Sequence, residues 1–121
     1  MEDVILEVGL QTRMSDSKIW KVTAQAVHSE TGAVFESYAR LVRPPGAGTI
    51  DHCHSFDKEG ISSDMINRNG VELKEAYQRI LELKKRWNTP PAGIRWQKHK
   101  QKKHFVSQLE SEYPGILGSD A

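Results

Sequence analysis

Residues 19–42 read IWKVTAQAVHSETGAVFESYARLV, and this stretch decides the fold. In its two halves, residues 19–28 and 33–42, β-branched and aromatic side chains alternate with polar ones, which is typical of strands with one buried face. The loop Ser29-Glu30-Thr31-Gly32 lies between them, and its glycine can take the positive φ that a tight hairpin loop requires. The stretch therefore predicts a β-hairpin.

The strand pattern extends back toward the N-terminus. Residues 4–10 read VILEVGL, an apolar run of strand length, and the polar segment 12–18 links this run to the hairpin. Three strands joined by short polar links are expected to form an antiparallel meander.

Beyond the hairpin the apolar spacing becomes helical. Over residues 71–87 apolar side chains recur every three or four positions, with charges on the other side, which predicts a long amphipathic helix. Residues 93–96 suit a short fourth strand, and residues 102–112 a second helix. The order of elements predicts an α/β fold with one mixed sheet, in which three antiparallel strands precede a helix, a strand and a helix.

The segment between the third strand and the long helix has weaker signals. Prolines and glycines at 44–48 end the third strand, because proline cannot donate to the ladder. We expect residues 49–60 to form an ordered loop, and Ser62 or Ser63 to cap a short helical turn.

The composition indicates one soluble domain over residues 1–121. A chain of 121 residues is long enough for one hydrophobic core and too short for two. We expect no membrane segment, because no run approaches the roughly 18 apolar residues that a membrane helix needs. The single cysteine, Cys53, excludes an internal disulfide and indicates an intracellular setting, cytoplasmic, nuclear or viral.

The charge is distributed unevenly along the chain. The formal net charge is only +1, yet residues 79–104 carry nine lysines and arginines against one acid, Glu82. A basic segment of this kind is either a solvated surface or a contact for an acidic partner.

Five segments in order resemble the DEDD 3′–5′ exonucleases, whose domain has a ribonuclease H-like fold. Residues 4–9 are similar to the first strand of that family, which reads apolar-apolar-apolar-Asp-x-Glu. The other four segments are similar to the second strand, the third strand, the His-Gly-Ile-Thr stretch before the first helix, and the His-Asn-x-x-Phe-Asp-x-x-Phe-Leu signature; they are residues 19–27, 32–44, 60–66 and 96–106. The last family motif would lie beyond position 121, so the resemblance implies a C-terminally short domain.

The departures from the family pattern concern its metal ligands. The family holds two divalent metals through four carboxylates, and one metal activates the attacking water. In this sequence Glu7 falls at the first aspartate, Gly9 at the glutamate and Lys102 at the second aspartate. The resemblance therefore implies a degenerate domain without catalytic residues or metal, in which Glu7 is a remnant and the vacated site is basic. We hypothesise that a Glu7–Lys102 ion pair replaces the lost metal.

The basic segment supplies the candidate binding residues. In the resembled fold the loop that precedes the second helix borders the substrate cleft. Cations there can contact phosphates, and an interleaved tryptophan can stack on bases. The candidates for a nucleic-acid interface are Arg95, Trp96, Lys98, Lys100, Lys102 and Lys103. The sequence leaves open whether the partner is DNA or RNA.

Three alternatives stay open. One is an active Mg²⁺- or Mn²⁺-dependent exonuclease that takes its missing ligands from Asp3, Asp51 or a partner chain. Another is a structural domain that binds a protein partner or forms a homodimer. The third concerns Asp51-His52-Cys53-His54, which contains metal-competent side chains and a thiol; a zinc site would need a second, distant pair of ligands, and a cysteine nucleophile would need a nearby base.

Overall fold

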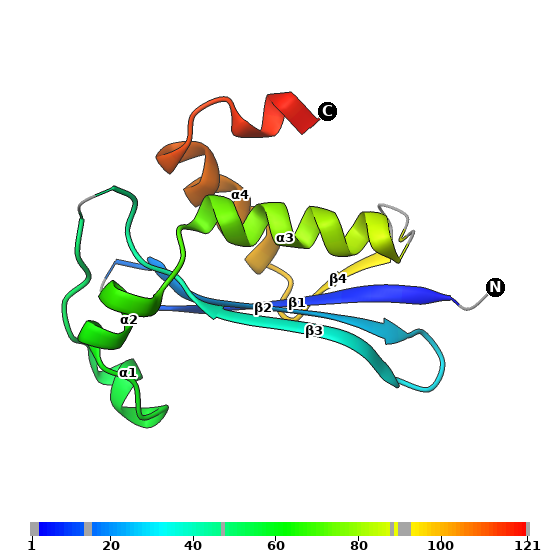
Figure 1. Cartoon of the computed structure of the whole chain (residues 1–121), viewed down its shortest axis with the longest axis horizontal. Coiled ribbons are helices and arrows are strands. Elements are labelled where there is room, and N and C mark those ends of the chain that lie inside the picture. Colours follow the sequence, from blue (N-terminus) through cyan, green and yellow to red (C-terminus); the bar gives the residue numbers. More distant parts are fainter. Residues whose placement is uncertain (1–2, 14–15, 47, 88, 90–92, 121) are drawn as a thin grey trace.

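The chain forms a four-stranded sheet with two long helices packed on one face (Figure 1). The computed structural model describes residues 3–13, 16–46, 48–87, 89 and 93–120. The elements, in chain order, are β1 (Val4–Thr12), β2 (Ile19–His28), β3 (Val34–Leu41), α1 (His54–Lys58), α2 (Ser63–Asn69), α3 (Leu73–Arg86), β4 (Ile94–Trp96), α4 (Gln101–Glu112) and the 3-10 helix η2 (Ile116–Asp120).

The strands lie in the order β3-β2-β1-β4. The first three strands are antiparallel, and β4 joins β1 in parallel, with Glu7 opposite Arg95. The hairpin loop between β2 and β3 ends at Gly32, which has a φ of 74° and donates its backbone N–H to the His28 carbonyl oxygen. The predicted mixed sheet, with three antiparallel strands followed by helix, strand and helix, is confirmed.

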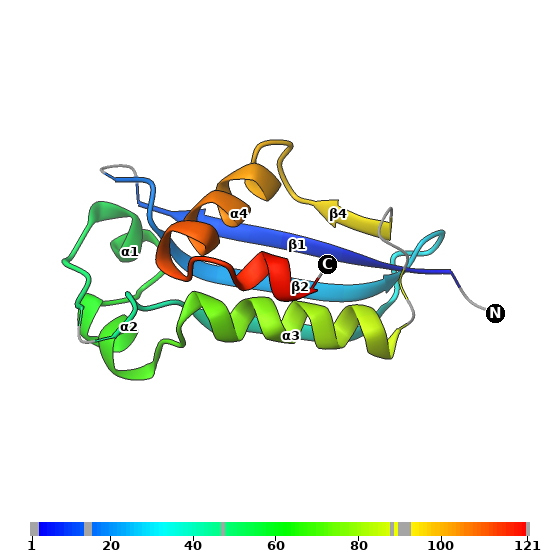
Figure 2. The ribbon, with the colours of Figure 1, turned by 90° about the horizontal axis from the view of Figure 1, so that it is seen from above.

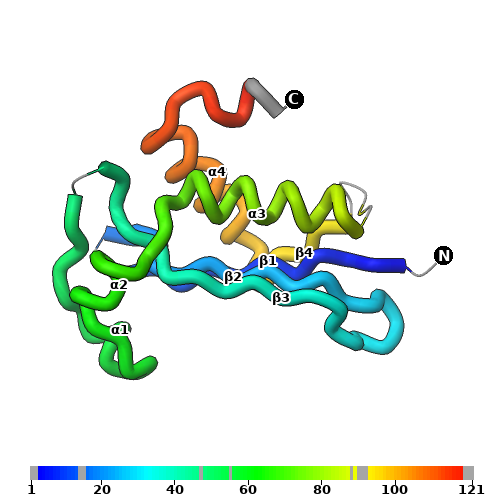
Figure 3. Tube along the Cα trace, viewed as in Figure 1, coloured from blue at the N-terminus to red at the C-terminus, as the bar shows by residue number. Residues whose placement is uncertain are grey.

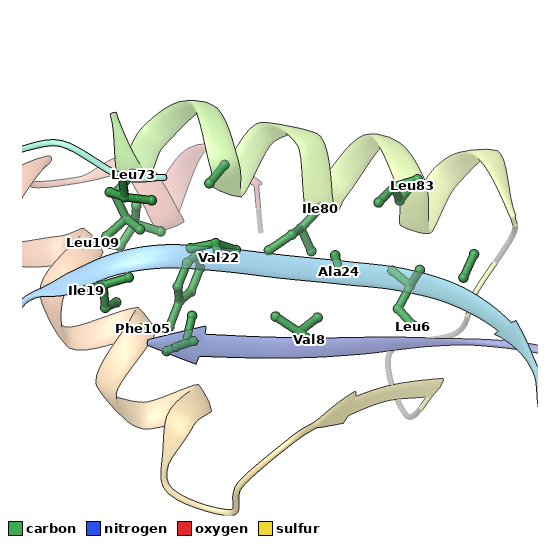
Figure 4. Packing of buried hydrophobic residues seen from close by; sticks show 14 residues of the cluster. Leu6, Val8, Ile19, Val22, Ala24, Leu73, Ile80, Leu83, Phe105 and Leu109 are labelled. Atoms are coloured by element: carbon green, nitrogen blue, oxygen red, sulfur yellow. The ribbon is translucent and has the colours of Figure 1, made fainter. Parts of the chain in front are cut away.

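The core lies between the sheet and the two long helices. Side chains alternate along β1, so that Leu6, Val8 and Leu10 are buried while Glu7 and Gln11 are exposed. Figure 4 shows Leu6 and Val8 among the buried side chains of β2, α3 and α4. Figure 2, seen from above, places α3 and α4 over this same face of the sheet.

Each of the two long helices buries one stripe of apolar side chains. In α3 the buried residues are Leu73, Ala76, Ile80 and Leu83, which recur every three or four positions. In α4 the buried residues are Phe105 and Leu109. Both helices agree with the predicted ranges to within two residues at each end. None of the described helices is long and apolar enough to span a bilayer.

The expectation that residues 49–60 form only an ordered loop is wrong, because they contain the short helix α1. Phe56 on α1 is fully buried and meets Trp20 of β2 edge-on, with the ring centroids 5.0 Å apart. Ile50 and Ile66 complete this second cluster. The tube in Figure 3 shows α1 and α2, the helices that carry Phe56 and Ile66, at one end of the sheet. A helix of five residues has too few turns for a periodic signal, so burial of one aromatic side chain decides the local structure.

The next helix begins as predicted. The Ser62 hydroxyl oxygen accepts a hydrogen bond from the Met65 backbone N–H at 3.1 Å, which caps α2.

We predict that Phe56→Ala destabilises the protein by about 3–5 kcal/mol, because it leaves a cavity beside Trp20 and removes the anchor of α1. Denaturant unfolding followed by tryptophan fluorescence measures the change. Met65→Ala on the neighbouring helix is the control, since Met65 is largely exposed. A loss below about 1 kcal/mol for Phe56→Ala would mean that the second cluster does not contribute to the fold.

Candidate functional site

The face of β1 that points away from α3 carries the position predicted as a metal-ligand remnant. Glu7 lies opposite Gln25 on β2 and opposite Arg95 on β4. One guanidinium nitrogen of Arg95 is 3.9 Å from the Glu7 carboxylate, and both side chains are well exposed. The hypothesised Glu7–Lys102 ion pair is therefore wrong, because the carboxylate is paired with the neighbouring strand and not with α4. An exposed pair at this distance contributes little to stability.

Gly9 is packed too closely to carry a longer side chain in this arrangement. A Cβ atom at Gly9 would lie 2.6 Å from the Gln97 side-chain oxygen and 2.9 Å from the Thr23 hydroxyl oxygen. Gln97 can swing away, because the clash is with the end of a flexible side chain. Thr23 is short and β-branched and has less freedom. A glutamate at this position would thus have to displace Gln97, which follows β4, and Thr23 on β2.

These residues line a shallow hollow of about 340 Å³ on the open face of the sheet. Its lining is Glu7, Val8, Gly9, Thr23, Gln25, Arg95, Trp96 and Gln97. One carboxylate and one guanidinium face it, and Lys102 is not part of it. The expectation that the vacated site is basic is therefore wrong: its two charges balance.

The residues present do not fit a pair of divalent metals. Such a site needs several oxygen ligands. Here the single carboxylate, that of Glu7, lies beside a cation. Within the described ranges, no three His, Cys, Asp or Glu side chains are grouped so that they could hold a metal ion.

In the Asp51-His52-Cys53-His54 segment, both histidine side chains contact a nearby carboxylate of the same segment of chain. His52 Nε2 lies 3.2 Å and His54 Nδ1 3.9 Å from one oxygen of Asp57, within the first turn of α1. Cys53 is half-buried and packs against the cluster around Phe56. The second pair of ligands that a zinc site needs is not brought to this segment in the described part of the chain.

The arginines of α3 are already neutralised. Arg79 binds Glu82 at 2.9 Å, and Arg86 binds Glu36 on β3. The Trp87 indole N–H also donates to Glu36, at 2.8 Å. The hydrogen bond from Trp87, together with that from Arg86, holds the pKa of Glu36 below its usual value. This part of the basic segment therefore serves the fold.

The lysines around the start of α4 are not neutralised. Lys98, Lys100, Lys102 and Lys103 are all exposed, and none forms an ion pair with a described residue. The first turn of α4 contains no acid, and no side chain caps its N-terminus. Figure 2 shows the short connection from β4 into this end of α4. Positive charge is thus concentrated where four of the predicted binding residues lie.

The two tryptophans of the basic segment pack within the protein. Trp96 is half-buried, and its ring centroid lies 5.6 Å from that of Phe105 in the core. Trp87 stacks on Phe35, with centroids 5.3 Å apart. The Trp96 ring is therefore part of the core packing, and the expectation that it offers a free surface for base stacking is not supported.

A second hollow, of about 740 Å³, lies between α4 and the segment that precedes β2. It brings Lys100 and Lys103 together with Lys18, His99 and His104, which sequence reasoning did not select. Residues 100, 103, 104 and 107 have the spacing of one helix face, so the sequence could have predicted that they lie together. Nothing in the sequence predicts that Lys18 joins them, because it is more than 80 positions away and meets α4 only in the fold.

The sequence matches no protein-family model and no curated protein. The structure is similar to that of the nuclease domain of 3'hExo, a DEDDh family member, solved with bound rAMP: the TM-score is 0.68 and the identity 12%, over 91% of this chain and 59% of that one. It is also similar to a full-length 3'-exonuclease, with a TM-score of 0.64 and 15% identity, over 91% of this chain and 52% of that one.

This chain therefore spans little more than half the length of either protein. At such low identity the likeness concerns architecture. The chain has the ribonuclease H-like fold of the DEDDh 3'-exonuclease nuclease domains.

Proposed function

We propose that the chain is a nucleic-acid-binding domain with an exonuclease-like fold that does not carry out two-metal hydrolysis. The observation that carries this proposal is the group of four unpaired lysines at the start of α4: Lys98, Lys100, Lys102 and Lys103. Phosphate groups are the partners that unpaired surface lysines bind through charge and counterion release. One protein of the same fold was solved with a bound nucleotide, rAMP, which favours a nucleic-acid partner over other polyanions.

The absence of hydrolysis is proposed from the residues at the family's ligand positions. Glu7 faces Arg95, and the space beside Gly9 is filled by Gln97 and Thr23. Lys102, which falls at the third ligand position in the sequence, supplies no carboxylate. Two-metal catalysis relies on carboxylates that hold both ions in place, and one partnered carboxylate cannot do so.

The distribution of charges along α4 favours an anion-binding surface over a surface that is only solvated. The positive end of a helix dipole lies at its N-terminus, so cations there are unfavourable by about 0.3–1 kcal/mol each. α4 has its lysines in the first turn and Glu110 and Glu112 near its C-terminus, which is the unfavourable order at both ends. Local rules of this kind are typically broken at functional positions, where a ligand compensates for the cost.

We predict that the protein binds a single-stranded oligonucleotide in a strongly salt-dependent manner. Each neutralised phosphate contributes a slope of about −0.7 to log K against log salt, so the four lysines together give a slope no steeper than roughly −3. Replacing Lys98, Lys100, Lys102 and Lys103 by alanine should lower the affinity at least tenfold and make the slope much shallower. Fluorescence anisotropy over a salt series measures both quantities.

The matched control for this experiment is Lys84→Ala with Lys85→Ala, which removes positive charge from α3. An affinity that stays constant between low and moderate salt would remove the proposal. So would an equal loss of affinity, per lysine replaced, in the α3 control.

We also predict that the protein does not degrade RNA or DNA when Mg²⁺ or Mn²⁺ is added. The assay follows the length of a labelled oligonucleotide on a gel, with Glu7→Ala as the control. Degradation by the wild type that Glu7→Ala abolishes would establish the alternative of an active nuclease with non-standard ligands. Degradation that Glu7→Ala leaves unchanged would point to a contaminant.

A third prediction separates binding from stability. Lys103→Glu places an acid in the first turn of α4, where the helix dipole favours it, so the free protein should become more stable by about 0.5–1 kcal/mol. The same variant should bind oligonucleotide more weakly. Thermal unfolding and anisotropy measure the two effects, and Lys85→Glu on α3 is the control. If Lys103→Glu changes neither stability nor affinity, the lysines of α4 are an ordinary solvated surface.

A further inference from the structure

The hollow beside α4 differs from the hollow over β1 in its charge. Its lining contains three lysines, two histidines and one acid, together with serines and one glutamine: Asp16, Ser17, Lys18, His99, Lys100, Lys103, His104, Ser107, Gln108 and Ser111. The hollow over β1, by contrast, has one cation for one anion. A concave surface lined by one sign of charge focuses the field and raises the local concentration of oppositely charged ligands.

The single acid of this lining is already neutralised. Asp16 accepts hydrogen bonds from the Arg13 guanidinium on both carboxylate oxygens. The hydrogen bond from Arg13 also lowers the pKa of Asp16. Lys18 forms an ion pair with Glu112 at 3.7 Å and stays half exposed, so its charge is partly neutralised. Lys100 and Lys103 have no carboxylate partner among the described residues, so these two lysines carry the unpaired positive charge of the hollow.

The walls of the hollow are fixed by hydrogen bonds. His104 Nε2 lies 2.6 Å from the Ser17 backbone oxygen, and since a carbonyl oxygen only accepts, Nε2 carries the proton and donates it. The Ile19 backbone N–H donates to the Gln108 side-chain oxygen at 3.1 Å. These two contacts tie α4 to the start of β2 at two points one turn apart. The hollow is therefore formed before any ligand binds, which lowers the ordering cost of binding.

The shape of the lining selects an extended ligand. Residues 100, 103, 104, 107 and 111 follow one face of α4, and eleven residues of helix span about 16 Å. One phosphate group would cover only part of that length. Cations occupy the N-terminal part of the stripe, and the hydroxyls of Ser107 and Ser111 follow; both kinds of side chain bind phosphate oxygens.

We propose that this groove binds consecutive phosphates of a single-stranded nucleic acid, through Lys18, Lys100 and Lys103 with the hydroxyls of Ser107 and Ser111. The proposal rests on the proposed function and assigns its location. Lys98 and Lys102 lie outside the groove lining, so within this group of four lysines we expect them to contribute less than Lys100 and Lys103. No Phe, Trp or Tyr lies in the described lining, so bases do not stack there and binding is independent of sequence.

The test compares two pairs of lysines on the same short segment. Anisotropy is measured with a labelled single-stranded oligonucleotide of about 12 nucleotides for the full-length wild type, Lys100→Ala with Lys103→Ala, and Lys98→Ala with Lys102→Ala. We expect the groove pair to lose at least tenfold in affinity and the other pair less than threefold. The salt slope of the groove pair should fall by about 1.4, which corresponds to two phosphate contacts.

A second variant tests the groove away from the helix terminus. Ser107→Glu puts a negative charge into the middle of the groove, at an exposed helical position that tolerates glutamate. It should lower the affinity at least tenfold. Ser29→Glu in the hairpin loop introduces the same charge elsewhere and should leave the affinity within twofold. Circular dichroism confirms that both variants are folded.

The outcomes separate the groove from the proposed function. Equal losses for the two lysine pairs, or wild-type affinity for Ser107→Glu, would overturn the groove and leave nucleic-acid binding intact. A wild type that binds no oligonucleotide at low salt would remove both. Equal affinity for a duplex of the same length would overturn the assignment to single strands. Full competition by millimolar inorganic phosphate would show that a single phosphate site is enough, and would overturn the extended path.

Discussion

The alternation of side chains along β1 is the constraint on which the rest of the structure depends. Because β1 pairs with β2 on one side and β4 on the other, its backbone is fixed at both edges. Leu6, Val8 and Leu10 must then face the helices, while Glu7 and Gly9 must face the open side. A shift by one residue would exchange the two sets and bury Glu7 without a partner, at a cost of several kcal/mol. The core and the open hollow are thus two consequences of one register.

The position of the carboxylates divides the basic segment into two parts. Arg79 and Arg86 have acids within reach, one turn along α3 or across on β3, so their charge is used in the fold. The lysines before and within the first turn of α4 have none, because the acids of that helix, Glu110 and Glu112, lie at its other end. The number of charged residues in each part of the sequence could not distinguish the paired arginines from the unpaired lysines, because the pairing depends on which acids the fold brings close.

Much of the fold could be predicted, because its signals are local. The β2–β3 hairpin, the helix α3 and the Ser62 cap follow from alternation, helical spacing and side-chain capping within a few residues. The errors concern contacts between distant residues. Helix α1 forms because Phe56 reaches Trp20, and Glu7 pairs with Arg95 because β4 joins β1 in parallel. Neither contact produces a periodic pattern in the sequence. The position of Lys18 beside α4 could not be predicted either, because it also depends on a contact between distant residues.

The two hollows share no lining residue. The hollow over β1 contains Glu7 and Gly9, which the sequence resemblance predicts to be former metal-ligand positions, and it holds one ion pair, between Glu7 and Arg95. The groove beside α4 is built from residues 16–18, which precede β2, and from residues of the segment 99–111. A substitution in the first hollow therefore leaves the lysines of the second in place. Under the function that we propose, the absence of metal ligands over β1 does not affect the groove, because different side chains line the two surfaces.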